Sequence, residues 1–470
     1  MRVREEIMKS DLFGGQIEKL FPIIISEKSD SASMDMVIEL LLLSGRSLPE
    51  VMMMMVPEAW EKHLTMPEER KAFYEYNACI MEPWDGPASI PFTDGDYIGA
   101  LLDRNGLRPS RYTITKSGKL IMSSETGVFD IAPEDVERHG RLEPGKMFLV
   151  DMNEGRIIDN EEIKNKIVTE RPYKKWLDKT RKKLQDIPNT NKAYPIETTN
   201  LKTRSRLFNY TTEDIQVVIT PMAQNGKEAL GSMGIDTPLA VLSDRPQLIS
   251  NYFKQLFAQV TNPPLDGIRE EIITDISLSL GKDRNIFSIT ERQCRKLQIQ
   301  NPVISNIDLE KIRNIHLADF KAITIKILYK KERGLNGLED ALENIISQVS
   351  KAVDNRTNII ILSDRGTNKD FAPIPALLAC SYVHHSLNRL RKRSYFDIVI
   401  ESAEPREPHQ FATLFGYGAS AINPYMVNEI IRLQVKKGFI TNLNEQQAVD
   451  NFNKAIGKGI LKIMNKIGIS

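Results

Sequence analysis

The stretch NIIILSD, residues 358–364, is a run of apolar, mostly β-branched residues that ends in a polar turn. A short run of this kind is typical of a strand buried on both faces, as strands are in a parallel sheet. FKAITIKILY at 320–329 and YFDIVIES at 395–402 share this composition, and helical patterns separate the three runs. Strands that alternate with helices predict an α/β domain whose functional edge, if it has one, lies at the carboxyl ends of the strands.

The part of the chain before residue 170 has a different pattern. Two helical segments come first, with Gly45 placed to end one and Pro49 placed to begin the next. From residue 90 onward, short β-prone runs alternate with Asp-Gly, Asn-Gly and Ser-Gly pairs, which are hairpin signals. Helices followed by hairpins predict an α+β arrangement with an antiparallel sheet. The methionine run 52–55 fits a soft binding surface or, as is more usual, a buried helix that fills a core.

A polar segment, residues 171–205, joins these two parts. Between Lys174 and Lys192 it has seven basic residues against two acidic ones, and it is rich in Asn and Thr. A binding patch and a solvated linker both fit this composition, and we interpret the segment as a linker between domains.

Bulk composition excludes several classes of function. The chain has 470 residues and a net charge of +1, whereas binding to phosphate backbones normally requires a basic excess, so no nucleic-acid partner is expected. No apolar signal core opens the chain, and charges and a proline interrupt the apolar stretch 37–55, so no membrane partner is expected. Three scattered cysteines indicate a reducing compartment: Cys79, Cys294 and Cys380.

Several longer motifs are too idiosyncratic to be coincidences of fold. They are KSDSASMD (28–35), EPWDGPA (82–88), LDRNGLRPSRY (102–112), YFKQLFAQVTNPPLDGIRE (252–270), LSDR (362–365), FGYGASAINPY (415–425) and LKIMNKIGIS (461–470). Together, and in this order, they resemble the large (alpha) subunit of glutamate synthase. The resemblance covers essentially the whole chain.

The resemblance implies a glutamine-dependent enzyme built from several parts. A class II amidotransferase domain cleaves glutamine, ammonia passes beside a central α/β domain, and an FMN-bearing barrel aminates 2-oxoglutarate and reduces the product to glutamate. Residues 1–170 would be the C-terminal part of the amidotransferase domain, 171–205 a linker, and 206–470 the central domain. The expected fold is a partial N-terminal-nucleophile amidotransferase fold, α+β, joined to an α/β domain with mainly parallel strands.

The same resemblance sets the expected cofactors and partners. FMN and an iron–sulfur cluster belong to the full-length enzyme, and none is expected on this chain, because an iron–sulfur cluster needs three or four neighbouring thiolates. The expected partners are L-glutamine, 2-oxoglutarate, the remaining large-subunit domains, and an electron-donating small subunit or ferredoxin. The expected location is the cytoplasm, or the plastid stroma for an organellar enzyme.

Glutaminase chemistry in the family requires an N-terminal cysteine, whose own α-amine serves as the base. Residue 1 is Met here, and Cys79, on a predicted helix, is interpreted as a small core residue. The family's Asn-Gly pair, which contributes to the oxyanion hole, would lie upstream of Met1, and loss of such a hole costs roughly 100-fold in rate. We therefore expect no catalytic residue and no glutaminase activity in this chain alone.

By resemblance, Asp30 matches the carboxylate that holds the α-amino group of substrate glutamine. An ammonium and a partly buried carboxylate make strong charge-assisted hydrogen bonds. The alternative is that Asp30 caps the helix that follows, with Ser29 and Ser31 nearby. Asp30 is the one substrate-binding residue that the sequence predicts.

Other polar sets have simpler interpretations. Loops 82–86 and 103–106 carry Gly or Asn where a tight turn needs positive φ, so both are interpreted as turns. Gly416 and Gly418 lack the rest of a phosphate-binding loop and favour close backbone packing. A metal cage is not expected from the proline-stiffened loop that carries Glu401, Glu404, Glu407 and His409.

The leading hypothesis is a section of a glutamate synthase large subunit, from a truncated gene or a split enzyme. The alternative, from a different class, is a non-catalytic glutamine-binding or docking scaffold for separate synthase domains. A third reading, an independent α/β enzyme, needs a converging polar set at the strand ends, and the sequence predicts none.

Overall fold

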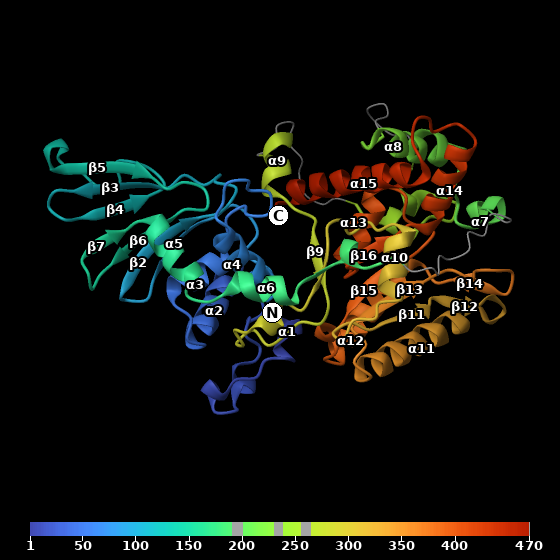
Figure 1. Ribbon diagram of the computed structural model, residues 1–470, viewed down its shortest axis with the longest axis horizontal. Coiled ribbons are helices and arrows are strands. Elements are labelled where there is room, and N and C mark those ends of the chain that lie inside the picture. The colour runs from blue at the N-terminus through green and yellow to red at the C-terminus, as the bar shows by residue number, and fades with distance from the viewer. Residues whose placement is uncertain (190–200, 230–237, 255–264, 470) are drawn as a thin grey trace.

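Four parallel strands form the sheet that the apolar runs predict (Figure 1): β11 (Ala322–Lys326), β13 (Ile359–Ser363), β15 (Asp397–Glu401) and β16 (Ala421–Asn423). They lie in that order, and every neighbouring pair is parallel. All five residues of β13 are buried, because both faces of the sheet are covered. The structure is a computed structural model that describes residues 1–189, 201–229, 238–254 and 265–469.

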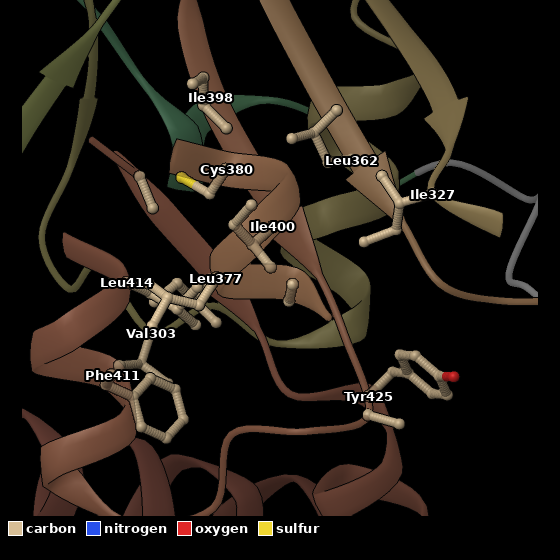
Figure 2. Packing of buried hydrophobic residues seen from close by; sticks show 14 of the residues in the cluster. Val303, Ile327, Leu362, Leu377, Cys380, Ile398, Ile400, Phe411, Leu414 and Tyr425 are labelled. Atoms are coloured by element: carbon tan, nitrogen blue, oxygen red, sulfur yellow. The ribbon is translucent and has the colours of Figure 1, made fainter. Parts of the chain in front are cut away.

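Helices cover both faces of the sheet: α11 (Gly334–Asp354), α12 (Ala376–Arg389) and α13 (Pro408–Gly416) on one face, and α10 (Asn306–Arg313) on the other. Alternate residues of β13 serve the two faces, as the period of a strand requires. Ile360 and Leu362 belong to the core with α11–α13, whereas Ile359 and Ile361 belong to the core with α10. Figure 2 shows part of the first core, where side chains of the sheet meet those of α12 and α13.

Further helices extend the larger core. α15 packs against α8, α13 and α14, and Asn444 begins α15 with a capping box that includes Gln447. A short antiparallel pair, β12 and β14, lies beside the sheet. The bounds are α7 (Leu201–Leu207), a π-helix (Asp214–Ile219), α8 (Thr220–Asn225), β12 (Leu328–Lys330), β14 (Phe371–Pro373), α14 (Tyr425–Lys436) and α15 (Glu445–Ile467).

The N-terminal part combines helices with two antiparallel sheets, β1-β2-β6-β7 and β4-β3-β5, as its hairpin signals predict. The helices are α1 (Arg2–Glu5), α2 (Asp30–Leu43), α3 (Leu48–Met55), α4 (Glu68–Ala78), α5 (Asn160–Thr169) and α6 (Tyr173–Thr180). The strands are β1 (Ser89–Thr93), β2 (Tyr97–Leu102), β3 (Arg111–Thr115), β4 (Leu120–Ser123), β5 (Val136–Arg141), β6 (Met147–Asp151) and β7 (Arg156–Ile158).

The methionine run belongs to α3 and is buried along its whole length, 52–55. Gly45 follows α2 with a φ of +92°, a conformation that glycine adopts without strain, and Pro49 lies in the first turn of α3. The interpretation of this run as core filling is confirmed.

One segment of the second part, residues 273–299, connects the two parts. It holds β9 (Leu278–Leu280), the 3-10 helix η8 (Glu291–Cys294) and β10 (Leu297–Ile299), and β10 pairs with β9 and with β8 (Lys182–Lys183). The chain reaches this segment through α9 (Gly267–Ile273). Its residues contribute to two cores. Ile286 and Cys294 belong to the N-terminal core, whereas Leu280 and Leu297 pack beneath the parallel sheet.

The predicted linker, 171–205, contains regular structure where it is described. Tyr173 and Leu177 of α6 are buried in the N-terminal core, and Arg204 of α7 forms an ion pair with Glu429 of α14 at 2.5 Å. Residues 190–200 lie outside the described residues, as do residues 255–264 of the motif that begins at Tyr252. The predicted domain boundaries stay predictions.

Candidate functional site

Asp30 is the first residue of α2, and its side chain is exposed. The cap of this helix is Ser29, whose Oγ accepts a hydrogen bond from the N–H of Ala32 at 3.2 Å. The Asp30 carboxylate accepts the N–H of the next residue, Ser31, at 2.8 Å. The assumption of a partly buried carboxylate is therefore wrong, and the capping role belongs to Ser29. The binding role of Asp30 stays a prediction.

The two polar loops are turns, as predicted. The Asp103 side chain is buried and accepts the N–H of Asn105 at 2.8 Å, an Asx turn that leads to Gly106 at a φ of +63°. In the other loop, the indole N–H of Trp84 donates to the carbonyl of Gly86, which has a φ of +103°.

A cavity of about 570 Å³ lies between the two parts of the chain. Its N-terminal wall comes from α1, from α4 and from the loops after α3 and β2, and it includes Glu61, Cys79 and Arg104. Its other wall comes from the 273–299 segment, from α12 and from the start of β15, and it includes Lys296. This cavity is large enough for a small polar ligand.

Most charges around the cavity are paired with one another or with backbone groups. Arg104 lies 3.7 Å from Glu61. Burial raises the pKa of Glu61, and the guanidinium of Arg104 offsets only part of that rise. Burial raises the pKa of Glu82, but the guanidinium of Arg4, 2.6 Å away, lowers it to about 2. Lys296 donates to the carbonyl of Gly281 at 2.7 Å. These interactions stabilise the walls of the cavity and leave few charges available to a ligand.

Cys79 is located differently from the prediction. α4 ends at Ala78, so Cys79 caps the helix and does not lie within it, and its side chain is half-buried on the cavity wall. The neighbouring Cys294 thiol lowers the pKa of Cys79 against the effect of burial. The interpretation of Cys79 as a buried core residue is therefore wrong.

A converging polar set does lie at the carboxyl ends of the parallel strands, contrary to the expectation from sequence. Arg365, two residues after β13, contacts Glu401 at 2.6 Å and Glu429 at 3.3 Å, and it stacks 3.8 Å above the ring of Tyr425. Arg313 of α10 lies 2.9 Å from Glu401, and Arg204 of α7 forms an ion pair with Glu429. Since Arg365 contacts both carboxylates, each of them has two arginine partners. This network joins the sheet to α7, α10 and α14.

The network is a set of buried ion pairs and leaves little space for a substrate. Glu401 and Glu429 are 1% and 4% exposed. The cavity beside Glu404, at the same edge, has a volume of about 10 Å³, too small for more than a single water. The arrangement favours a structural role over an independent active site.

Two carboxyl groups near this edge have raised pKa values. Asp364 is 1% exposed, and burial raises its pKa to about 6, although its carboxylate accepts hydrogen bonds from Ser402 and from the N–H of Ala403. Burial and then the charge of Asp364 raise the pKa of Glu404 to about 7, against the N–H of Ala376, which donates to it at 3.0 Å.

Gly418 packs closely against α12, as its position predicts. It has a φ of +100°, and a β-carbon there would collide with the imidazole of His384. Burial, and then the nearby Arg393, lowers the pKa of His384 to about 4. Among the described residues, no group of three or more His, Cys, Asp or Glu side chains is placed to hold a metal ion, and no helix has the length and hydropathy of a membrane span.

Comparison with known proteins identifies both parts. The family model of class-II glutamine amidotransferases matches residues 1–176, and that of the glutamate synthase central domain matches residues 203–470. The chain belongs to the glutamate synthase family.

Relatives match the whole chain, but the chain matches only part of them. The glutamate synthase [NADPH] large chain of Bacillus subtilis is 44% identical over 470 residues, which are 100% of this chain and 30% of that relative. The glutamate synthase [NADH] of Schizosaccharomyces pombe is 42% identical over 100% of this chain and 23% of its own length. The ferredoxin-dependent glutamate synthase of Pyropia yezoensis is 38% identical over 100% of this chain and 31% of its own length. The chain thus spans less than a third of these glutamate synthases.

Proposed function

We propose that these residues are the amidotransferase and central section of a glutamate synthase large subunit. The whole protein would transfer the amide nitrogen of glutamine to 2-oxoglutarate and reduce the product to glutamate. The observation that carries this proposal is the match of two family models, in family order, along one chain that its relatives cover completely. The N-terminal part would be the C-terminal portion of an N-terminal-nucleophile amidotransferase fold.

The residues described do not fit the iron–sulfur cluster of the family. A cluster needs three or four thiolates close together, whereas Cys380 is fully buried in the core of the parallel sheet and Cys294 is buried in the N-terminal core. We propose that the iron–sulfur cluster and FMN are held by other parts of the whole enzyme. The electron donor stays open, because the relatives are named for NADPH, NADH and ferredoxin.

We further propose that the glutaminase nucleophile is not one of the three cysteines of this chain. Burial raises the pKa of the Cys380 thiol to about 12, and Cys294 is 1% exposed. Cys79 lines the cavity, and the amine of Lys296, whose charge lowers the pKa of Cys79, is held by Gly281 and Asp283. Among the described residues, none of these thiols forms a hydrogen bond with a carboxylate or an imidazole that could act as its base.

A section swap tests the proposal. The corresponding residues of the Bacillus subtilis large chain would be replaced by these 470 residues, and the chimera expressed in a strain that cannot make glutamate. We expect growth without added glutamate. Absence of growth from a chimera that accumulates as soluble protein would count against the assignment.

Asp30 is the proposed binding residue for the α-amino group of glutamine. In the chimera, Asp30→Asn should raise the KM for glutamine by about 10- to 100-fold, since a charge-assisted hydrogen bond contributes about 1.5–3 kcal/mol. The value of kcat should change much less. Steady-state kinetics at varied glutamine concentration measures both parameters.

Asp35→Asn is the matched control, because Asp35 is also an exposed aspartate of α2. An equal rise in KM for both variants would remove the specific role of Asp30. The alternative function, a glutamine-binding scaffold, predicts that the chain by itself binds L-glutamine in calorimetry and that Asp30→Asn abolishes the binding.

A further inference from the structure

A second cavity, of about 260 Å³, lies where β8, β10, the start of α10 and the first half of α15 meet. The segment between the two family matches contributes residues 183–185, and the central-domain match contributes the other residues around it. Gln298 of β10 also lines the cavity of about 570 Å³, so the two cavities adjoin at that strand. None of the described residues around the smaller cavity has a role in the proposed function.

Two acidic and two basic residues line this cavity. They are Asp308, Asp450, Lys183 and Lys454. Among the described residues, no opposite charge lies within 4.0 Å of any of the four, in contrast with the paired charges around the larger cavity. Charges of both signs are therefore available to a bound molecule.

Each of the two carboxylates keeps one oxygen without a hydrogen-bond partner within the described part of the chain. The Asp308 Oδ2 accepts the hydroxyl of Ser305 at 2.7 Å, and the Asp450 Oδ1 accepts the side-chain amide of Gln446 at 2.8 Å. Burial raises the pKa of Asp450 against that hydrogen bond, and the charge of Asp308 raises it further. A cationic group bound beside these two carboxylates would therefore be stabilised.

Carboxamide side chains complete the lining. Asn453 is 7% exposed, and its Oδ1 is buried with no hydrogen-bond partner among the described residues. A buried acceptor without a donor costs free energy, so a donor on a bound molecule would be stabilising there. Gln298 and Gln300 add further amides, whereas the Asn301 amide is held by the N–H of Val303 at 2.9 Å and by the backbone carbonyl of Asn453 at 3.2 Å.

We propose that this cavity binds a free α-amino acid in its zwitterionic form. Asp308 and Asp450 hold the ammonium group, Lys183 and Lys454 hold the carboxylate, and the Asn453 Oδ1 accepts an N–H of the ligand. An inorganic anion would be repelled by the two aspartates and a metal cation by the two lysines, whereas a zwitterion matches both pairs. A volume of about 260 Å³ is below the range of drug-sized ligands and suits a smaller molecule of this kind.

The bound amino acid would connect three separate stretches of the sequence, since it contacts the segment between the family matches, α10 and α15. Because α15 also packs against α8, α13 and α14, the ligand would stabilise the larger core through this helix. The site is separate from Asp30, so this inference goes beyond the proposed function.

Calorimetry on the soluble section-swap chimera tests the proposal. Its glutaminase nucleophile would be blocked with 6-diazo-5-oxo-L-norleucine and 2-oxoglutarate kept in excess, so that the proposed substrate sites are occupied. Each proteinogenic amino acid would then be titrated in turn, with acetate and methylammonium as probes that carry a single charge. We expect at least one amino acid to bind at one site per chain, and neither single-charge probe to bind at the same concentration. Absence of binding by every amino acid, or equal binding of acetate or methylammonium, would overturn the proposal.

Asp450→Asn and Lys454→Gln locate the site, because both side chains are exposed on α15 and neither substitution should impair folding. Each should weaken binding of that amino acid by at least about 10-fold, since each removes a charge-assisted interaction. Lys462 is another exposed lysine of α15, outside the described lining of the cavity, so Lys462→Gln is the matched control and should leave the affinity unchanged. Unchanged affinity in both cavity variants, or an equal loss in the control, would contradict the assignment.

The outcome is independent of the test of the proposed function. Growth of the chimera without added glutamate reports on the family assignment and needs no amino acid in this cavity. A chimera that supports growth but binds no amino acid would overturn this inference and leave the proposed function intact.

Discussion

Asp364 and Glu404 differ from their neighbours Glu401 and Glu429, which are held by arginines. The carboxylates of Asp364 and Glu404 accept from hydroxyl and backbone donors, which come from Ser402, Ala403 and Ala376. Such donors only partly offset the cost of burying a charge, so the neutral forms are favoured and both pKa values rise. These side chains therefore make the stability of the fold depend on pH in the neutral range.

Glu404→Gln should remove part of that dependence. The pKa of Glu404 is about 7 in the folded chain and near 4.5 when unfolded, so its contribution to stability is present at low pH and is lost as pH rises through 7. At pH 8 the variant should be more stable than the wild type by about 1–3 kcal/mol, and near pH 4.5 the two should be similar. Glutamine can still accept the N–H of Ala376.

Urea unfolding at several pH values from about 4.5 to about 8.5 measures this difference. A difference between the two proteins that stays constant over this range would contradict the raised pKa of Glu404.

Which charges meet at this edge could not be predicted from the sequence. Arg204, Arg365 and Glu429 come from different elements, and only the packing of α7 and α14 against the sheet brings them together. The motif LSDR was identified by resemblance, but the residues around Arg365 in the sequence do not indicate that it contacts Glu401 and Glu429.

The turn between α13 and β16 contains two glycines with different surroundings. Gly418 combines a positive φ with contact against His384 of α12, so both the backbone and the space require glycine. Gly416, two residues earlier, ends α13, and a β-carbon added there would meet open space among the described residues. Within the motif 415–425, therefore, the structure requires glycine at position 418 but not at position 416.

Gly418→Ala should destabilise the chain by about 2–3 kcal/mol, through backbone strain and the collision with His384. Gly416→Ala, the matched control, should be neutral or stabilising by up to about 1 kcal/mol, because alanine favours a helix. Chemical denaturation of both variants measures the difference. Equal effects of the two substitutions would contradict the close packing of Gly418.

Regular elements were predictable where the pattern of residues is local. The strands β13 and β15 followed from their apolar runs, and the burial of α3 followed from its methionines. The 273–299 segment was not predictable, because its strands are short and its role depends on contacts with two distant cores. Asp30 was identified by resemblance alone, since the local pattern also fits a helix cap.

At the scale of the whole molecule, the two family-matched parts are physically joined. Ile286 and Cys294 lie beyond residue 203, in the central-domain match, yet they pack in the core of the N-terminal part. Ion pairs such as Arg104 with Glu61 line the cavity at this junction, where Arg104 also reaches the carbonyl of Ile273. The boundary between the family matches is therefore not a boundary between cores.

This organisation supports the proposal that the chain works as one section of a larger enzyme. Its own parallel sheet carries a buried network of ion pairs, and none of its described thiols is hydrogen-bonded to a carboxylate or an imidazole. We therefore propose that the chemistry comes from groups elsewhere in the whole protein. The section swap into the Bacillus subtilis large chain supplies those groups in their natural order.

The most direct measurement follows nitrogen through that chimera. Purified chimera, together with the electron-donating small subunit, would be given 2-oxoglutarate, NADPH and glutamine labelled with ¹⁵N in the amide group, and the glutamate formed would be analysed by mass spectrometry. We predict that labelled and unlabelled glutamate form in equal amounts, with one NADPH oxidised for each labelled molecule. A soluble chimera that oxidises no NADPH and forms no labelled glutamate would contradict the account.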